Sequence, residues 1–112
     1  MPNQTAQLTL VFQALADPTR RAVVERLSRG PTATSELAQP FKMALPSFLQ
    51  HLEVLHKCGL VQSRKSGRVR TYELAPDTLK AAEEWMATQR TLWERRLDRL
   101  DSFLEDLKEQ SE

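Results

Sequence analysis

A chain of 112 residues is long enough for one compact domain, and its hydrophobic share of 40% and charged share of 28% are those of ordinary globular proteins. The single cysteine, Cys58, cannot form an intramolecular disulfide, and no apolar segment reaches the ~20 residues that a membrane-spanning helix needs. The composition therefore argues against a disulfide-stapled scaffold, a disordered chain and a membrane protein, and we expect one cytoplasmic domain over residues 1–112.

The net charge of +1 conceals two unlike parts of the chain. Residues 1–75 contain ten basic and five acidic side chains, whereas residues 76–112 contain six basic and ten acidic ones. A basic region favours a polyanionic partner, because the summed field of its side chains attracts negative charge. The charge distribution suggests that the first part presents a face to a polyanion and that the second part has another role, although a charged run can also be a solvated face.

Four helices are predicted in quick succession in the first part. Apolar residues at helical spacing predict a helix over residues 5–16. Asp17-Pro18 is typical of a helix start and Gly30-Pro31 of a helix stop, so a second helix lies between them. A short third helix over residues 34–41 and a tight connection precede a fourth helix over residues 45–57.

The predicted fourth helix has two different faces. At 100° per residue one side collects apolar side chains that we expect to point inward: Leu45, Phe48, Leu49, Leu52 and Leu55. The other side presents Ser47, Gln50 and His51, which can donate and accept hydrogen bonds. This face is poor in charge for a purely solvated surface, and we expect it to contact a partner.

A β-hairpin is predicted next, over residues 60–74. Two extended runs flank the glycine-containing turn Lys65-Ser66-Gly67. Four cations lie near its end: Arg64, Lys65, Arg68 and Arg70. Tyr72 alternates with them and is expected to face the core. A hairpin projects such a cluster away from the domain, where it can meet a polyanion.

The last predicted helix, over residues 77–108, repeats apolar residues at intervals of seven from Leu79 to Leu107. So wide a stripe exceeds what the short helices of this domain can cover, which predicts a second copy of the chain as the partner. We expect the first helix to contribute as well, so that the homodimer contacts are Leu8, Phe12, Met86, Trp93, Leu97, Leu100 and Leu104.

The expected order α-α-α-α-β-β-α is mainly helical with a small hairpin, as in a winged helix-turn-helix, with the helix-turn-helix over residues 34–57. The local sequence resembles the ArsR/SmtB family of regulators. The resemblance is carried by five segments in order: Phe12–Arg21, Ser35–Ala38, Pro46–Leu55, Gly59–Val61 and Gly67–Tyr72. It covers residues 8–76 closely and the last helix more loosely.

The resemblance implies a sequence-specific DNA-binding transcriptional regulator, a repressor that binds a pseudo-palindromic double-stranded operator as a homodimer through its first and last helices. Ser47, Gln50 and His51 would then read base edges in the major groove. The hairpin cations Arg64, Lys65, Arg68 and Arg70 would meet phosphates or the minor groove. Arg20, Arg21 and Lys57 are further candidates for phosphate contact; for the two arginines a salt bridge or a solvated pair is an equal alternative.

The chain departs from the metal-sensing members that the resemblance brings with it. It has no Cys-x-Cys pair in the third helix and no histidine in the last, so we expect no metal site and no cofactor. His51, His56 and Cys58 are offset by five and two residues, which scatters them around a helix. A metal site across the dimer and a redox-sensing Cys58 remain open alternatives. Ala44 stands where the family usually has a capping serine.

Two other classes of function compete with DNA binding. A winged helix can serve as a protein-interaction module, with its basic hairpin solvated. Against this, DNA explains a polar, charge-poor fourth helix beside a cationic hairpin. An enzyme is the weaker alternative, because no phosphate-binding loop or nucleophile motif occurs and only two histidines are available as general bases. We expect no catalytic residues.

Overall fold

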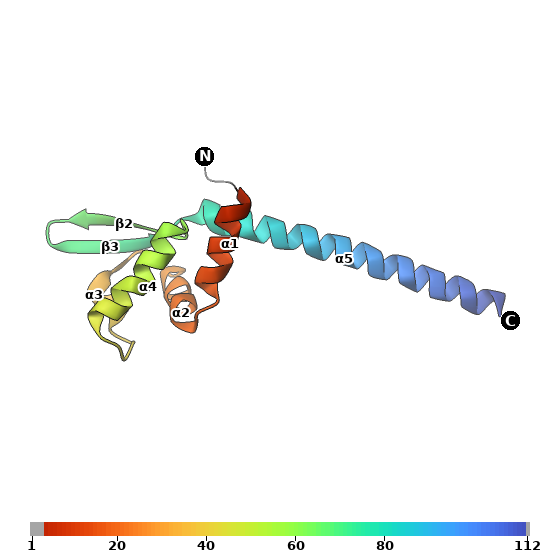
Figure 1. Cartoon of the computed structure of the whole chain (residues 1–112), viewed down its shortest axis with the longest axis horizontal. Helices are drawn as coiled ribbons and strands as arrows, with labels where there is room; N and C mark the ends of the chain where they lie inside the picture. Colours follow the sequence, from red (N-terminus) through yellow and green to blue (C-terminus); the bar gives the residue numbers. More distant parts are fainter. Residues whose placement is uncertain (1–3, 112) are drawn as a thin grey trace. The chain divides into compact units, whose positions relative to one another are not determined.

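The computed structural model describes residues 4–111 and divides into two compact units, residues 1–80 and residues 81–112. The first unit contains seven complete elements, and α5 (Pro76–Gln110) begins in it and makes up the second (Figure 1). The seven are α1 (Gln4–Leu15), α2 (Pro18–Leu27), β1 (Thr32–Ala33), α3 (Thr34–Ala38), α4 (Leu45–Lys57), β2 (Val61–Ser66) and β3 (Val69–Leu74).

The mainly helical winged helix-turn-helix order is confirmed, and the structure adds one strand. The hairpin of β2 and β3 is part of a three-stranded antiparallel sheet with the order β1-β3-β2. Thr32 of β1 pairs with Tyr72 and Ala33 pairs with Thr71, so β3 is the central strand. A two-residue strand has too few positions for a periodic pattern, and sequence reasoning missed it.

Helix α3 is shorter than predicted, ending at Ala38 instead of residue 41. Pro40 gives the physical reason, because proline has no N–H to donate to the carbonyl four residues before it, so the helical hydrogen bonds cannot continue. Phe41 follows in the connection to α4, and its ring packs on that of Phe48 with centroids 5.2 Å apart. The shorter helix therefore leaves a longer turn before α4.

The C-terminus of α4 is closed by a Schellman motif. The N–H of Leu60 donates to the carbonyl of Leu55 at 3.1 Å, and that of Gly59 donates to the carbonyl of His56 at 3.0 Å. Gly59 has a φ of +85°, and a Cβ there would lie 3.1 Å from side-chain atoms of both Gln7 and Thr78. This turn directs the chain from α4 into β2, which sets where the hairpin begins.

The core of the first unit is built by four helices and the sheet. Its buried side chains include Val11, Ala14, Val23, Leu27, Leu37, Phe48, Leu52, Leu55, Leu60 and Val61. Tyr72 is 9% exposed, so the prediction that it faces the core is confirmed. These contacts hold α4 against α1, α2 and β2.

The prediction that Leu45 and Leu49 of α4 point inward is wrong. Their side chains are 53% and 42% exposed, whereas Phe48, Leu52 and Leu55 are buried. At 100° per residue Leu45 and Leu49 lie about 50° and 90° from the middle of the buried arc. The apolar face of α4 is thus wider than the surface that α1, α2 and β2 offer it, and its edge is left at the surface.

The N-terminus of α4 lacks a side-chain cap, because its N-cap residue is Ala44. Its backbone is extended, with φ −64° and ψ 144°, which suits a capping serine. We expect Ala44→Ser to raise the free energy of unfolding by about 1 kcal/mol. Urea denaturation at a fixed protein concentration measures this, and a curve that overlays that of the wild type would contradict it.

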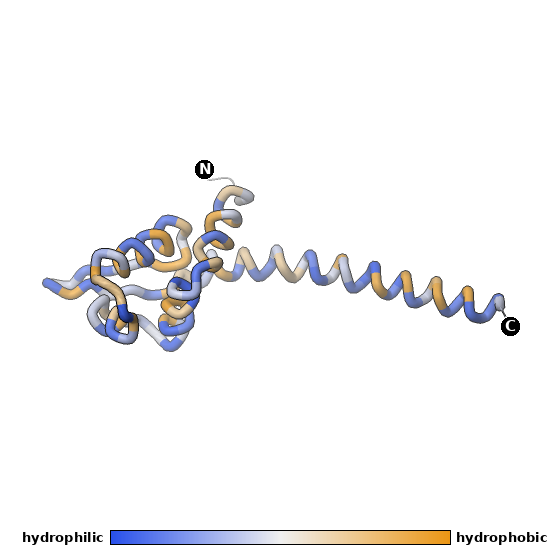
Figure 2. The backbone as a smooth tube through the Cα atoms, turned by 60° about the horizontal axis from the view of Figure 1, so that its bottom comes forward, coloured by the Kyte–Doolittle hydropathy of each residue, from blue (hydrophilic) through white to orange (hydrophobic). Residues whose placement is uncertain are grey.

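The second unit is the helical segment that starts at Ala81. Apolar and polar stretches alternate along α5 (Figure 2). The α5 residues predicted to form dimer contacts are all exposed: Met86, Trp93, Leu97, Leu100 and Leu104. Among residues 4–111, no helix combines the length and the apolar character that crossing a membrane requires.

Candidate nucleic-acid interface

The outward face of α4 carries the polar residues that the sequence singled out. Ser47 and Gln50 are exposed there, opposite the buried arc of this helix. Val54, four residues after Gln50, is 38% exposed on the same side. Lys57 is also exposed, with its Nζ 3.9 Å from Glu53 Oε1. The face is therefore a strip of hydrogen-bonding groups with one apolar side chain and one ion pair near its end.

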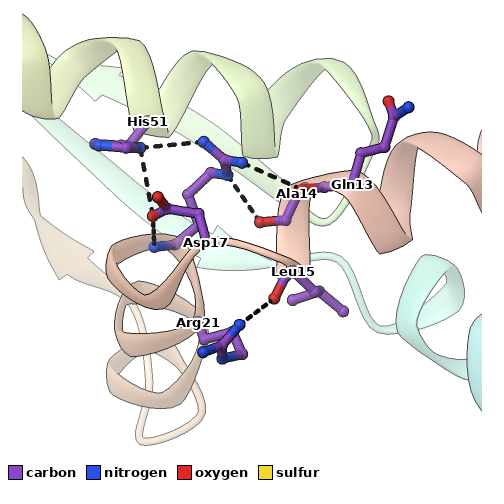
Figure 3. A network of polar contacts seen from close by, with 7 residues as sticks. Gln13, Ala14, Leu15, Asp17, Arg21 and His51 are labelled. Carbon is purple, nitrogen blue, oxygen red and sulfur yellow. Dashed lines mark hydrogen bonds and ion pairs between the residues drawn. The ribbon is translucent and has the colours of Figure 1, made fainter.

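His51 differs from its neighbours on α4 because it is tied to α2. Its side chain is 23% exposed, and its Nδ1 lies 3.2 Å from Arg20 Nη1 and 3.7 Å from Asp17 Oδ2 (Figure 3). One edge of the ring is thus directed into the protein. The other ring nitrogen, Nε2, lies on the far side of the ring from these partners.

Arg20 and Arg21 bind the C-terminal end of α1. Arg20 donates from Nε to the carbonyl of Ala14 at 2.7 Å and from Nη2 to that of Gln13 at 3.2 Å. Arg21 donates from Nη1 to the carbonyl of Leu15 at 2.7 Å (Figure 3). Cations stabilise a helix C-terminus because its last carbonyls lack intrahelical donors. Sequence reasoning missed this role, although adjacent arginines just after a helix end are its signal.

Asp17 starts α2, as predicted. Its Oδ2 accepts a hydrogen bond from the backbone N–H of Arg20 at 3.0 Å, which is the N-cap geometry. This bond, with smaller contributions from the charges of His51 and Arg20, holds the pKa of the carboxyl below its ordinary value despite partial burial. Asp17 is therefore a carboxylate at neutral pH, beside the ring of His51.

The far end of the hairpin is a tight turn formed by Gly67 and Arg68. Gly67 has a φ of +63° and Arg68 does not have a positive φ, which is the pattern of a type II′ turn. In Figure 1 this end of the hairpin lies beyond the helices of the first unit. Lys65 and Arg68 are both exposed there. The turn thus presents two cations at the extremity of the unit.

The two remaining hairpin arginines have partners within the hairpin. Arg64 Nη2 lies 3.6 Å from Glu73 Oε2, and Arg70 Nη1 donates to Ser63 Oγ at 2.8 Å. Residues paired across antiparallel strands share a face, so Lys65 and Arg70 lie on one face of the hairpin and Arg64 on the other. The cations are therefore distributed over both faces and the tip.

The hairpin is also attached to the helix-turn-helix. Thr34 at the start of α3 donates from Oγ1 to the carbonyl of Arg70 at 2.9 Å, and β1 pairs with β3 immediately before α3. These bonds connect the strand that carries Arg70 to the helix that precedes α4. The hairpin is thus tied to the start of the helix-turn-helix by one side-chain bond and by strand pairing.

Cys58 is buried at the end of α4, with 2% of its surface exposed. Its Sγ donates to the carbonyl of Leu55 at 3.3 Å, and burial raises the pKa of the thiol. Reactive cysteines are accessible and have a lowered pKa, so this environment does not favour the redox-sensor alternative. In the part of the chain that the structure describes, no three His, Cys, Asp or Glu residues gather in a way that could hold a metal ion.

These features together define a class of protein. A short helix, a turn and a second helix with an exposed polar face lie beside a basic β-hairpin, which is the arrangement of a winged helix-turn-helix DNA-binding domain. A family model described as a helix-turn-helix domain matches residues 15–64. The match covers α2, α3, α4 and the first part of the hairpin.

Curated relatives are transcriptional regulators. The HTH-type transcriptional regulator Rv2034 of Mycobacterium tuberculosis is 50% identical over 70 residues, which cover 62% of this chain. The alignment spans 65% of that relative, just under two thirds of its length. The transcriptional repressor SdpR of Bacillus subtilis is 30% identical over 76 residues, covering 68% of this chain and 84% of the repressor.

Solved structures agree with this assignment. The crystal structure of an ArsR family transcriptional regulator, RHA00566, matches this chain with a TM-score of 0.77 and 53% sequence identity. The match covers 84% of this chain and 97% of that regulator's chain. A homodimeric winged helix-turn-helix DNA-binding domain from Mycobacterium bovis is 26% identical with a TM-score of 0.61, over 77% of this chain and 82% of that domain. The chain belongs to the ArsR/SmtB family of DNA-binding transcriptional regulators.

Proposed function

We propose that this chain is a homodimeric repressor that binds a pseudo-palindromic operator and has no catalytic activity. The observation that carries the proposal is the exposed polar face of α4 beside a hairpin with cations at its tip. A helix fits the major groove, which is about 12 Å wide, and a two-fold dimer calls for half-sites about one helical turn apart. The relative from Bacillus subtilis is itself a repressor, which supports this mode of regulation.

In this proposal the face of α4 reads the base edges. Gln50 can pair with adenine through two hydrogen bonds, and Ser47 can donate or accept. Val54 adds an apolar surface that suits the methyl group of thymine, and its exposure supports this role. His51 contributes through the edge of its ring that is turned away from Arg20.

The hairpin cations bind phosphates with different strengths in this proposal. Lys65 and Arg68 at the tip contribute most. Arg64 contributes less because Glu73 lies 3.6 Å away, and the negative charge of this carboxylate weakens the attraction of Arg64 for a phosphate. Arg70 already donates to Ser63. Lys57 remains a phosphate candidate, and the contacts of Arg20 and Arg21 with α1 support a structural role for those two.

The dimer forms through α5 with a contribution from α1. Apolar residues at positions of a seven-residue repeat are exposed from Trp93 to Leu107, which is typical of a helix that packs on another helix. Leu8 and Phe12 of α1 are half-buried, so part of each side chain lies at the surface of the first unit. The homodimeric neighbour from Mycobacterium bovis supports a second copy of this chain as the partner. Since its partner is DNA, we place the protein in the cytoplasm.

Two single variants separate base reading from phosphate binding. Gln50→Ala should lose mainly the discrimination between sequences, worth about 1–3 kcal/mol for a bidentate contact. Arg68→Ala should weaken binding to all DNA and lower the slope of log K against log salt by about one. Fluorescence anisotropy with the DNA upstream of the protein's own gene and with random DNA, over a salt series, measures both effects.

Arg64→Ala is the matched control for Arg68→Ala. It removes the same charge from the same hairpin, and we expect a smaller loss because Glu73 already partly neutralises it. If Gln50→Ala kept the full operator preference, the assignment of the reading face would be wrong. If the wild-type chain bound no DNA, the proposal would fall in favour of a protein-interaction module.

A further inference from the structure

The side chain of Arg20 joins three helices of the first unit. It belongs to α2, donates to two carbonyls at the end of α1, and lies 3.2 Å from Nδ1 of His51 on α4 (Figure 3). Its own backbone N–H donates to Asp17 at the start of α2. The guanidinium is therefore held by α1 on one side and faces α4 on the other.

This contact constrains which ring nitrogen of His51 can carry a hydrogen. A guanidinium can only donate, so Nδ1 of His51 must be the acceptor. A neutral imidazole has one N–H, which then lies on Nε2. Asp17 Oδ2 at 3.7 Å would favour a hydrogen on Nδ1, but that hydrogen would point at the donor group of Arg20. Asp17 and Arg20 therefore favour opposite tautomers, and Arg20 makes the shorter of the two contacts with Nδ1.

We propose that Arg20 is a positioning residue for operator recognition, which holds His51 in the tautomer that donates from Nε2 to a hydrogen-bond acceptor on DNA. This inference rests on the proposed function. The acceptor is an oxygen or nitrogen of a base edge or a phosphate oxygen, and guanine N7 and O6 are the base atoms that such a donor suits best. Arg20 itself does not contact DNA.

The tautomer is tested first on the free protein. Long-range ¹H–¹⁵N correlation spectra at about pH 8.5, where an ordinary imidazole is neutral, identify the protonated ring nitrogen. Wild-type His51 should carry its hydrogen on Nε2. Arg20→Ala leaves the backbone N–H that caps Asp17 in place, so Asp17 should then draw the hydrogen to Nδ1. The exposed His56, the only other histidine, is an internal reference in every spectrum.

Arg21→Ala is the matched control. Arg21 also donates to the end of α1, at Leu15, but makes no contact with His51 in Figure 3. Its removal should leave the tautomer of His51 and the operator affinity unchanged. If wild-type His51 carried its hydrogen on Nδ1, or if Arg20→Ala left the tautomer as it was, the positioning role of Arg20 would be overturned.

Operator binding is tested in a double-mutant cycle. His51→Ala and Arg20→Ala should each weaken binding about tenfold, as expected for one lost hydrogen bond to DNA, and Arg20→Ala should add less than about twofold to His51→Ala. If Arg20→Ala weakened operator binding by the same factor in the wild type and in His51→Ala, Arg20 would contact DNA directly and the proposal would be overturned. A salt slope lowered by about one in Arg20→Ala would have the same meaning.

His51→Gln keeps the test decisive if Arg20→Ala does not fold. Glutamine carries an amide N–H close to the place of Nε2 and has no ring tautomer to select. It should bind the operator within about threefold of the wild type, whereas His51→Ala loses about tenfold. Equal affinities of His51→Gln and His51→Ala would contradict a donated hydrogen bond.

The two sources of the acceptor give different results. Loss confined to operators with one particular base identifies a base edge, and equal loss on operator and random DNA identifies a phosphate. If the wild type showed no preference for any DNA, the proposed function would fail together with this role. Operator binding with a tautomer that does not depend on Arg20 would overturn the role of Arg20 alone.

Discussion

The double variant Leu97→Glu and Leu100→Glu is expected to be monomeric and to bind the operator at least ~100-fold more weakly than the wild type. Both side chains lie in the exposed apolar stripe of α5, with exposed fractions of 40% and 51%. In a dimer they would face a second apolar helix, where a carboxylate without a partner is strongly unfavourable. A monomer reaches one half-site at a time, so the gain from linking two reading helices is lost.

Sedimentation equilibrium measures the assembly state, and anisotropy with operator DNA measures the affinity. The matched control is Thr91→Glu with Ser102→Glu, which adds the same two charges on the opposite side of α5. Both residues are exposed. We expect the control to remain dimeric and to keep most of its affinity, with a small loss from added negative charge. A dimeric Leu97→Glu and Leu100→Glu variant would show that the subunits associate elsewhere.

Phe48→Ala is expected to lower the free energy of unfolding by about 3–5 kcal/mol. The ring of Phe48 is 1% exposed and packs on Phe41 with centroids 5.2 Å apart. Its removal leaves a cavity between α4 and the rest of the core, because the neighbouring backbone can relax only in part. The same cavity would loosen the helix that carries the reading face.

The adjacent residue supplies the control for this prediction. Leu49 is 42% exposed, and Leu49→Ala should cost less than about 1 kcal/mol. Urea denaturation of both variants, at the same protein concentration because dimerisation adds to apparent stability, compares the two costs. Equal losses for Phe48→Ala and Leu49→Ala would mean that α4 is oriented differently on the core.

The elements of this fold were predictable where local chemistry determines them. Asp17-Pro18 marks the start of α2 because one carboxylate can cap free N–H groups within three residues. Gly30-Pro31 marks the end of α2 because glycine adopts a positive φ after a helix and proline cannot extend one. The alternation around Gly67 predicts the hairpin. Each of these signals lies within a few residues of the structure it describes.

The predictions failed where the structure of a segment depends on the other elements that pack against it. Leu45 and Leu49 are apolar and in phase with the core, yet the elements that pack on α4 do not extend far enough to cover them. Strand β1 forms because the backbone of Thr32 and Ala33 pairs with that of Tyr72 and Thr71 on β3. Neither fact is present in the local pattern, because both depend on elements elsewhere in the chain.

For the candidate site, the residue types and their faces follow from the sequence by itself. Gln50 on the open side of α4 results from the helical period, which the order of residues determines. The hairpin was predicted to turn at Lys65-Ser66-Gly67, whereas in the structure β2 continues to Ser66 and the turn is formed by Gly67 and Arg68. The partners of Arg20 were decided by the tertiary structure alone, since its three contacts lie on α1 and α4. Periodicity specifies which way a side chain points along its own element, but a hydrogen bond between elements exists only when packing brings donor and acceptor within about 3 Å.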